Sequence, residues 1–565
     1  AMYKTNMATA TCHVQRVGLV IQVLTLSVLL CFAQARKGKP NFVFMHDEST
    51  DGRTYLPGSQ VPIPNIRKLQ ARGINFENHY VNVPICCPSR ASMWSGRQPH
   101  HIPHVHNAIQ VNGAWNNYEG VGTNVTDPGV NDDQLIYGHL QQAGYTVQLS
   151  GKEDWSSGGH SLTTMVDSWT LYARFPYSQP EEGGWHIWGD CGGNLSVLPG
   201  NQSAHEADWK VVQNNVEWLA KKGKASEPFF LYQGLNIVHP EYDTSQVYLD
   251  RIDQHKIIIP HWEPLEDLHP CDFQTTMKKG CASFDYQNTT EHKRLIIAGY
   301  YAMIAEYDDM VGVYVDGVEQ AGLTDDTIFF LSSDHGDMQM QHQQFYKMVA
   351  YEASTHVPLV IAPGKNFPLL KYRGGIKHLT SAVDMMPTFL DLAGVKKPTT
   401  LDGHSLIEFL KTGDDSTHPT NVISQFHGEN LVMSWYMVRE GEIKATFWGT
   451  GKQHPAQMFN LTSDPNENNN LALDNANKPL LDHMETLLLA QADYPKISID
   501  VATYNINMAK WWVSTEPKWR CILNGTCEAN SGAKGSLNPD WGICICMREW
   551  RVCGSEKRAR GQMYV

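Results

Sequence analysis

The chain has 565 residues, of which 42% are hydrophobic and 18% are charged. This length excludes a mini-protein held together by disulfides, and it is enough for one large hydrophobic core with a smaller one beside it. The formal net charge of −14 argues against a nucleic-acid-binding protein, so an anionic ligand would need a locally positive pocket.

The first predicted element is an apolar run, Val17–Ala33, which follows Arg16. Ala33-Gln34-Ala35 has the small-x-small pattern of a signal peptidase site, so we interpret residues 1–35 as a cleaved signal peptide. A membrane anchor is the alternative, but no second apolar segment of this length follows, and we expect no stable membrane span. The sequence thus predicts entry into the secretory pathway.

Glycosylation sequons and cysteines agree with this route. Cys271 and Cys281 could close a short loop, and five cysteines crowd the stretch from Cys521 to Cys553, which favours disulfides of unassigned connectivity. Glycosylation is expected at six N-x-S/T sequons: Asn124, Asn194, Asn201, Asn288, Asn460 and Asn524.

From Pro40 onward, short apolar runs alternate with longer amphipathic ones, which predicts parallel strands with crossover helices. A polar residue just after a strand is often only a helix cap or a turn residue. Several of them would meet at the carboxyl edge of an α/β sheet, where such folds place their active sites. Four predicted strands end this way: Asn41–Met45 before His46 and Asp47, Tyr145–Ser150 before Gly151 and Lys152, Pro228–Asn236 before His239, and Thr327–Ser333 before Asp334 and His335.

The pattern changes along the chain and predicts its domains. Residues 291–320 form a long helix with apolar residues at helical spacing, which we interpret as scaffold. After residue 403 short alternating runs indicate a small antiparallel sheet, followed by a helix over 478–492. We therefore predict a catalytic domain over 36–403, a smaller α+β domain over 404–510 and a cysteine-rich tail over 511–565.

The stretch "VNVPICCPSRASMWSGR", residues 81–97, places Cys86 next to Cys87. Adjacent cysteines close only a strained disulfide ring. They are also a weak zinc signal, because no second pair with ligand spacing lies nearby. What remains is the spacing Cys86-x-Pro88-x-Arg90.

This spacing resembles the signature of the sulfatases, and the resemblance extends from about residue 40 to about residue 504 through "NFVFMHDE", "GYTVQLSGK", "PFFLYQGLNIVHP", "LSSDHGD" and "FNLTSDPNENNNLA". It implies an alkaline-phosphatase-like α/β fold, with a mostly parallel central sheet between helices. It also implies that the formylglycine-generating enzyme converts Cys86 to formylglycine in the endoplasmic reticulum, with Cys87 as the unspecified residue of the motif.

The chemistry of sulfate esters agrees with this resemblance. Hydrolysis needs a nucleophile, neutralisation of the sulfate oxygens and an acid for the leaving alcohol. A thiolate would form a thiosulfate that water releases poorly, whereas one hydroxyl of an aldehyde hydrate attacks sulfur and the other then expels sulfate. Calcium, the ion implied by the resemblance, would be held by oxygen-rich ligands. The implied metal ligands are Asp47, Asp334 and His335, with the modified Cys86.

The chain departs from the family pattern at three places. Glu48 stands where a second aspartate is frequent, and Asp51 comes a turn later, so which of them joins the metal site is open. His335 replaces a frequent asparagine, and an imidazole is an unusual ligand for a hard ion, so it could contact sulfate or water instead. Many members have a histidine two residues after Lys152, a role that His160 could fill.

For the positive pocket, Arg90 should lie in the first turn of a helix, whose N-terminus favours anions. The resemblance implies that Lys152 and Lys347 bind sulfate, that His239 lies near the leaving group and that His269 contacts substrate. A solvated helix residue is the alternative for Lys347, and a turn histidine before proline is the alternative for His269.

Further stretches, "ICCPSRASMWSG", "QFYKMVAYEASTHVPL", "QFHG" and "YPKIS", resemble one glycosaminoglycan-degrading branch of the family. They imply a lysosomal or secreted, exo-acting glucuronate-2-sulfatase, with a sulfated glycosaminoglycan or an aryl sulfate as substrate. Two alternatives are a phosphate- or phosphonate-ester hydrolase of the same superfold, and a non-catalytic glycan-binding glycoprotein in which Cys86 stays a thiol.

Overall fold

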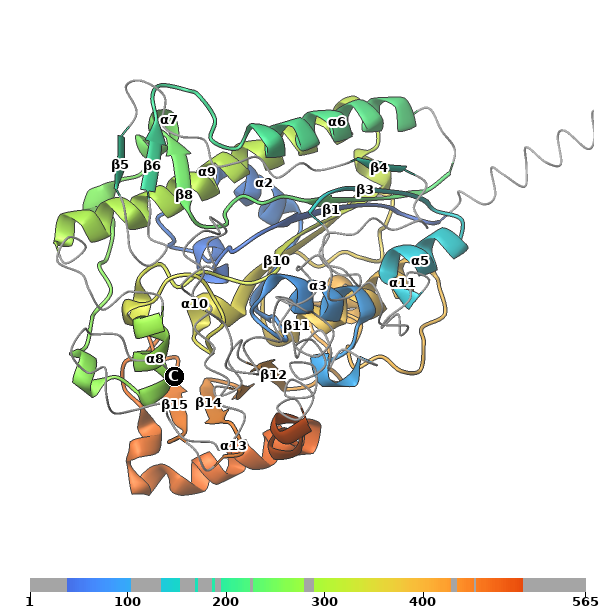
Figure 1. The fold of residues 1–565 in the computed structure, drawn as a ribbon. Helices are drawn as coiled ribbons and strands as arrows, with labels where there is room; N and C mark the ends of the chain where they lie inside the picture. Colours follow the sequence, from blue (N-terminus) through green and yellow to red (C-terminus); the bar gives the residue numbers. More distant parts are fainter. Residues whose placement is uncertain are drawn as a thin grey trace, which may run out of the picture. The chain divides into compact units, whose positions relative to one another are not determined.

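An eight-stranded sheet forms the centre of the computed structural model (Figure 1), in the order β11-β2-β10-β9-β1-β7-β3-β4. β10 is antiparallel to both of its neighbours, and the other pairs are parallel. The strands are β1 (Asn41–Asp47), β2 (Ile74–Tyr80), β3 (Thr146–Gly151), β4 (Ser168–Thr170), β7 (Phe229–Gly234), β9 (Thr327–Ser333), β10 (His356–Pro363) and β11 (Gly374–Ser381).

The structure describes most of the chain from residue 38 to residue 500. All described residues belong to one compact unit, 1–505, and the second unit, 506–565, lies outside them. The described ranges are 38–102, 134–152, 168–170, 185–187, 195–223, 227–278, 289–427, 434–451 and 454–500.

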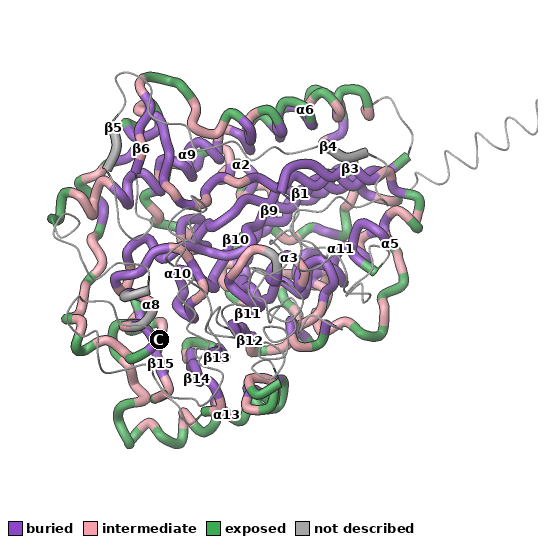
Figure 2. Tube along the Cα trace, viewed as in Figure 1, coloured by how far each residue is buried: buried purple, intermediate pink, exposed green. Residues whose placement is uncertain are grey.

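Helices cover both faces of the sheet. The side chains of β1 alternate: Val43 and Met45 pack into one apolar cluster, while Phe42 and Phe44 pack into the other. Figure 2 shows the central strands β1, β9 and β10 buried and much of α6 exposed. The first cluster contains side chains of α2 (Pro64–Arg72), α6 (Glu206–Lys222) and α9 (Thr290–Gln320), and the second contains side chains of α3 (Cys86–Ser95), α5 (Ile136–Gln142), α11 (Met385–Ala393) and α12 (Ile407–Thr412).

A four-stranded antiparallel sheet follows the core, with β12 (Asn421–Phe426), β13 (Trp435–Glu440), β14 (Ile443–Trp448) and β15 (Gln457–Asn460). One face packs on α13 (Lys478–Gln491), and the other joins core residues of β2. Three further strands form a small sheet, and three short helices complete the described strands and α-helices: β5 (Trp185–Ile187), β6 (Leu195–Leu198), β8 (Tyr242–Ser245), α7 (Gln246–Leu249), α8 (Pro270–Lys278) and α10 (Glu352–Thr355).

The predicted strands, the long helix and the small C-terminal sheet are confirmed, each within a few residues. The predicted disulfide at Cys271 is not, because Cys271 is a free, buried thiol; Cys281 lies outside the described residues. The domain boundary at residue 403 stays a prediction, as does the signal peptide. No described helix combines the length and the apolar character that crossing a bilayer requires.

Two of the predicted glycosylation sites lie in the described chain. Asn201 is exposed in a turn, and Asn460 is partly buried at the end of β15, where its Oδ1 accepts from the Thr462 amide at 3.0 Å. Asn124, Asn194, Asn288 and Asn524 lie outside the described residues.

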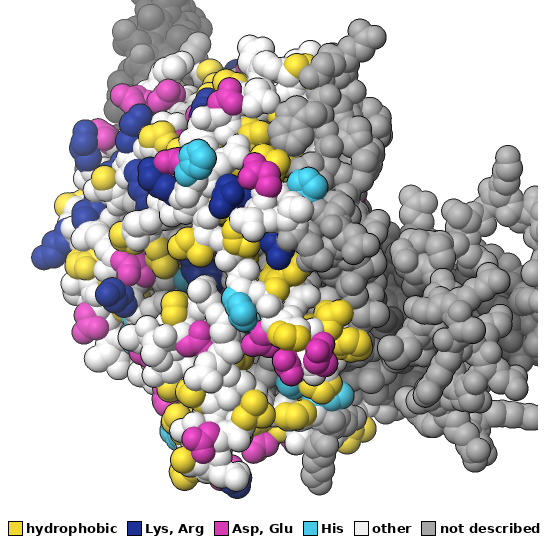
Figure 3. Space-filling model, turned by 90° about the vertical axis from the view of Figure 1, so that its left-hand side faces the viewer, with side chains coloured by type: hydrophobic (Ala, Val, Ile, Leu, Met, Phe, Trp, Pro, Cys, Tyr) yellow, Lys and Arg dark blue, Asp and Glu magenta, His cyan; other side chains and the backbone are white. Residues whose placement is uncertain are grey.

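Figure 3 shows one face of the molecule, where basic and acidic side chains are interspersed, so an anionic ligand on this face would depend on local cations.

Buried charges join the C-terminal sheet to the core. The Lys444 ammonium on β14 lies 2.9 Å from Glu352 Oε1 and 2.7 Å from Glu467 Oε1, and its side chain is 1% exposed. Glu352 also accepts from the hydroxyl of Tyr80 on β2 at 2.6 Å, and Arg439 on β13 lies 3.5 Å from the same carboxylate. Because each charge has an opposite partner, the group is stable only while it is complete.

Replacing Lys444 with methionine is expected to lower the free energy of unfolding by about 3 kcal/mol, because two buried carboxylates lose their shared cation. Lys478→Met is the matched control, since Lys478 pairs with Asp482 on the surface with its side chain 68% exposed, and a change within about 0.5 kcal/mol is expected there. Chemical unfolding measures both. Equal stabilities of the two variants would contradict this account of the network.

Candidate active site

Polar residues from several strands meet at the carboxyl edge of the sheet. β1 ends at Asp47, and β9 is followed by Asp334 and His335. These two strands are parallel neighbours with Asp47 opposite Ser333, so the residues after them lie side by side. Cys86 is the first residue of α3. The predicted convergence of these residues on one edge is confirmed.

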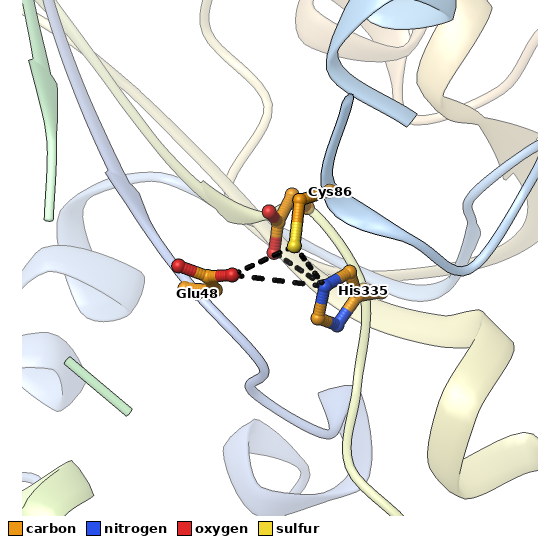
Figure 4. Close-up of side chains that lie close together, drawn as sticks. Glu48, Cys86 and His335 are labelled. Atoms are coloured by element: carbon orange, nitrogen blue, oxygen red, sulfur yellow. Dashed lines mark hydrogen bonds and ion pairs between the residues drawn. The ribbon is translucent and has the colours of Figure 1, made fainter. Parts of the chain in front are cut away.

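Four side chains, which we call the Cys86 group, bring possible ligand atoms within 4.8 Å of one another: Glu48, Cys86, Asp334 and His335. Figure 4 shows three of them, Glu48, Cys86 and His335, pointing toward one another. The Cys86 thiol donates to Glu48 Oε1 at 2.8 Å, and its sulfur lies 3.3 Å from His335 Nε2. His335 Nε2 lies 3.5 Å from Asp334 Oδ1.

Asp47 lies next to this group and carries an unsatisfied oxygen. Its Oδ2 accepts from the Thr50 hydroxyl at 2.5 Å, whereas its buried Oδ1 has no hydrogen-bond partner among the described residues. Burial raises the pKa of Asp47, and the nearby Asp334 charge raises it further. A buried carboxylate oxygen without a donor is costly, and a cation would satisfy it.

The charges of the site suit a divalent cation together with an anionic ligand. The carboxylates of Asp47, Glu48 and Asp334 are matched by three cations, Arg90, Lys152 and Lys347, all of them buried. A divalent cation would give this group a net positive charge, which the single negative charge of a sulfate monoester would partly neutralise. The carboxylate oxygens are the ligands that hard divalent ions prefer, so the residues present fit such an ion.

The encoded thiol is a poor nucleophile in this environment. Burial raises the pKa of Cys86 to about 12, and the Glu48 charge contributes. Because the thiolate is the reactive form of cysteine, an unmodified Cys86 would be inert near neutral pH.

Arg90 holds the second carboxylate oxygen of Asp334, Oδ2. Its Nε donates to Asp334 Oδ2 at 2.9 Å, and its Nη1 donates to the Tyr232 hydroxyl at 2.6 Å. Both partners of the ion pair are fully buried. Tyr232 also contacts Nδ1 of His46 at 3.0 Å. Sequence patterns missed Tyr232, because a tyrosine inside a buried apolar strand gives no signal of a polar role.

The contacts of Lys152 show which acidic residue, Glu48 or Asp51, joins the site. Its ammonium lies 2.6 and 2.5 Å from the two carboxylate oxygens of Glu48. Burial raises the pKa of Glu48, but the Lys152 charge and other cations outweigh this effect and lower the pKa well below its usual value. Asp51 instead pairs with Arg53 at 2.7 Å. Glu48 is therefore the carboxylate in the group.

The position of Lys152 depends on close contact between β3 and β7. Its amide donates to the Gly234 carbonyl at 2.8 Å. Gly151 has φ +82°, and a Cβ there would lie 1.8 Å from the Gly234 oxygen. Only glycine fits, since it has no Cβ and tolerates positive φ.

His239 and Lys347 form a second pair beside Glu48. The Lys347 ammonium donates to His239 Nε2 at 2.8 Å, and the same nitrogen lies 3.7 Å from Glu48 Oε1. Burial lowers the pKa of His239, and the Lys347 charge lowers it further, so the imidazole is neutral near pH 7. The His239 side chain is 32% exposed, which places this pair where the site reaches the surface.

His269 has different partners from the other predicted residues. Its Nε2 donates to the Pro455 carbonyl at 3.0 Å, its Nδ1 accepts from the Cys271 amide at 3.2 Å, and its ring stacks on Trp448. None of these three partners belongs to the Cys86 group. Trp448 packs in the apolar cluster that Ile85 and Met348 also join. His160, the other weak candidate, lies outside the described residues.

Comparison with known families identifies this arrangement. The family model described as sulfatase matches residues 40–395, more than half of the chain. A second model, the C-terminal region of N-sulphoglucosamine sulphohydrolase, matches residues 340–493. The chain belongs to the sulfatase family. Arylsulfatase K of Bos taurus is 36% identical over 496 residues, which cover 84% of this chain and 85% of that protein. The chain is accordingly a sulfuric ester hydrolase, of a family that uses a formylglycine and a divalent metal.

Solved structures confirm the fold class. The phosphonate monoester hydrolase of Agrobacterium radiobacter has a TM-score of 0.65 at 20% identity, covering 81% of this chain and 96% of that one. A protein described as a 2-O GAG sulfatase has a TM-score of 0.60 at 21% identity, covering 82% and 93%. This sulfatase therefore has the predicted alkaline-phosphatase-like core, with a small antiparallel sheet toward the C-terminus.

Replacing Asp47 or Asp334 with asparagine is expected to reduce bound divalent metal by about tenfold or more, because each change removes a carboxylate charge from the group. Asp308→Asn is the control, since this buried carboxylate caps α2 through the Asn65 and Ile66 amides. Metal content after dialysis, measured by mass spectrometry, tests this. Full metal retention by the Asp47 and Asp334 variants would place the metal elsewhere.

Proposed function

We propose that this sulfatase is calcium-dependent and removes the 2-sulfate from glucuronate at the end of glycosaminoglycan chains, after the formylglycine-generating enzyme has converted Cys86 to formylglycine. The observation that carries the proposal is the position of the Cys86 sulfur, 2.8 Å from Glu48 and 3.3 Å from His335, beside buried lysine and arginine side chains. The modified side chain would supply the nucleophilic oxygen for sulfur in place of the inert thiol.

In this proposal the buried residues have different roles in the reaction. Asp47, Glu48 and Asp334 would hold calcium with the modified Cys86, and the ion would polarise a sulfate oxygen. Arg90 holds Asp334 in place, and its position in the first turns of α3 adds to the positive potential of the helix N-terminus. His335 Nδ1 lies 3.0 Å from the Gly336 carbonyl, so the ring would present Nε2 to the metal, to sulfate or to a bound water.

Lys152 and Lys347 would neutralise the sulfate oxygens as charge develops on them. The proton for the leaving alcohol would come from the hydrogen-bonded pair of Lys347 and His239. His239 is neutral in this structure and accepts from Lys347 through Nε2, so the pair holds a proton at the point where the site reaches the surface.

Known relatives support parts of the proposed substrate. Arylsulfatase K of Bos taurus and of Homo sapiens, at 36% and 35% identity, support sulfate-ester hydrolysis. The saccharide substrate, the lysosomal or secreted location and a role for His269 in binding the sugar rest on the resemblance of the sequence stretches to that branch of the family. A protein of the same fold described as a 2-O GAG sulfatase agrees with the 2-sulfate. Phosphonate-ester hydrolysis is the second candidate, because the phosphonate monoester hydrolase has the same fold.

The state of Cys86 decides between these functions and a non-catalytic glycan-binding role. In protein secreted by cells with an active formylglycine-generating enzyme, the tryptic peptide that contains Cys86 is expected to show the mass loss of the aldehyde. A Cys86 that is entirely unmodified would contradict the sulfatase mechanism.

Wild type and Cys86→Ala should also be assayed with 4-nitrophenyl sulfate, 4-nitrophenyl phosphate and a glucuronate-2-sulfate disaccharide. We expect kcat/KM to fall at least about a thousandfold in the variant, because the nucleophile is lost. Higher kcat/KM on the phosphate ester than on either sulfate would favour the second candidate. Activity on the aryl sulfate without activity on the disaccharide would contradict the substrate and leave the reaction class intact.

A further inference from the structure

The loop that carries His239 is held at every amide. It follows β7, and its path is fixed by backbone contact with the residue after β1: the Glu48 amide donates to Ile237 O at 3.1 Å, and the Val238 amide donates to Glu48 O at 2.8 Å. The His239 amide donates to Asn236 O at 2.8 Å. The Leu235 amide donates to His46 O at 2.9 Å, so two amides remain, those of Asn236 and Ile237.

Asp208 accepts both of them. Its Oδ1 accepts from the Asn236 amide at 3.1 Å, and its Oδ2 accepts from the Ile237 amide at 2.9 Å. Asp208 lies in the first turn of α6, outside the Cys86 group, and is 1% exposed. It is thus a buried carboxylate whose two oxygens are both used by the loop that ends in His239.

The chemistry of this contact requires a carboxylate. Two neighbouring amides that point to one side chain need two acceptor oxygens, and an ionised aspartate supplies them. An asparagine supplies one oxygen and an NH2 group. The NH2 group is itself a hydrogen-bond donor, so it could not accept from the second backbone amide. Ile237 is buried and Asn236 is partly buried, so leaving either amide without an acceptor is costly and the loop would shift.

We propose that Asp208 is a positioning residue for His239, which fixes the distance between the His239–Lys347 pair and the leaving-group oxygen of the substrate. This inference rests on the proposed role of that pair in protonating the leaving alcohol. Asp208 itself touches neither substrate nor metal. Its effect on the reaction passes through the backbone of residues 236–239 and falls on the step that needs the proton.

This role has a kinetic signature that general destabilisation lacks. Proton donation matters most when the leaving group is a poor one, and little when it is a stable phenolate. Asp208→Asn should therefore lower kcat about tenfold to a hundredfold on phenyl sulfate but about threefold or less on 4-nitrophenyl sulfate, because a misplaced acid loses much of its contribution.

The matched control is Asp308→Asn. Asp308 is also a buried carboxylate that accepts from two consecutive backbone amides, those of Asn65 and Ile66, but it holds the start of α2. Loss of stability alone should affect both variants. Only Asp208→Asn should change the dependence of kcat on the leaving group, and in a His239→Gln background it should add little further change, because the group that it positions is gone.

The measurements are kcat across substituted phenyl sulfates, with the formylglycine fraction and bound metal measured in each variant, and hydrogen exchange of the peptide spanning residues 235–240. Faster exchange in Asp208→Asn than in Asp308→Asn, with a steeper leaving-group dependence, is the expected result. A leaving-group dependence equal to that of wild type would overturn the proposal, as would unchanged exchange. Failure of the proposed function itself would look different, since wild type would then hydrolyse no sulfate ester while the exchange result still reports on Asp208.

Discussion

The site depends on the burial of opposite charges at one edge of the sheet. Three carboxylates and three cations are removed from water within a short distance, and they arrive on several elements, with Asp47 and Glu48 at the end of β1, Arg90 on α3, Lys152 after β3 and Asp334 after β9. A single charge buried in this way would be prohibitively costly, whereas a matched set is stable when its hydrogen bonds are complete. The ion pairs Lys152–Glu48 and Arg90–Asp334 therefore fix the ends of four elements relative to one another.

Around these pairs the backbone is arranged so that side chains need not find their places independently. Gly151 and Gly234 let β3 and β7 approach closely, and the Lys152 amide is bound to the Gly234 carbonyl. The Glu48 backbone pairs with the loop before His239. Such contacts hold a catalytic group with little conformational entropy left to lose when the substrate binds.

Much of this could be predicted from the sequence, for physical reasons. β1 and β9 are buried on both faces, so they are continuous apolar runs, and the ionisable residues at their ends stand out. Glu48 and Asp51 could not be separated from the sequence, because both follow the same strand and only their contacts, with Lys152 and with Arg53, distinguish them. Asp208 was missed because an aspartate in the first turn of an amphipathic helix is ordinary. His269 was placed by resemblance alone, and its stacking on Trp448 depends on a strand of the C-terminal sheet far along the chain.

The distance along the chain between Cys86 and its partners determines how long after the synthesis of Cys86 its pocket can form. Its sulfur contacts His335, which is 249 residues further on. At about 5–20 residues per second, a ribosome needs on the order of ten to fifty seconds to add that stretch. During this interval the cysteine has no completed pocket to enter, so the modifying enzyme of the proposed function would meet it before the domain has folded. Closure of the sheet edge by β9 would end that period of access, which links the order of strands in the sequence to the chemistry of residue 86.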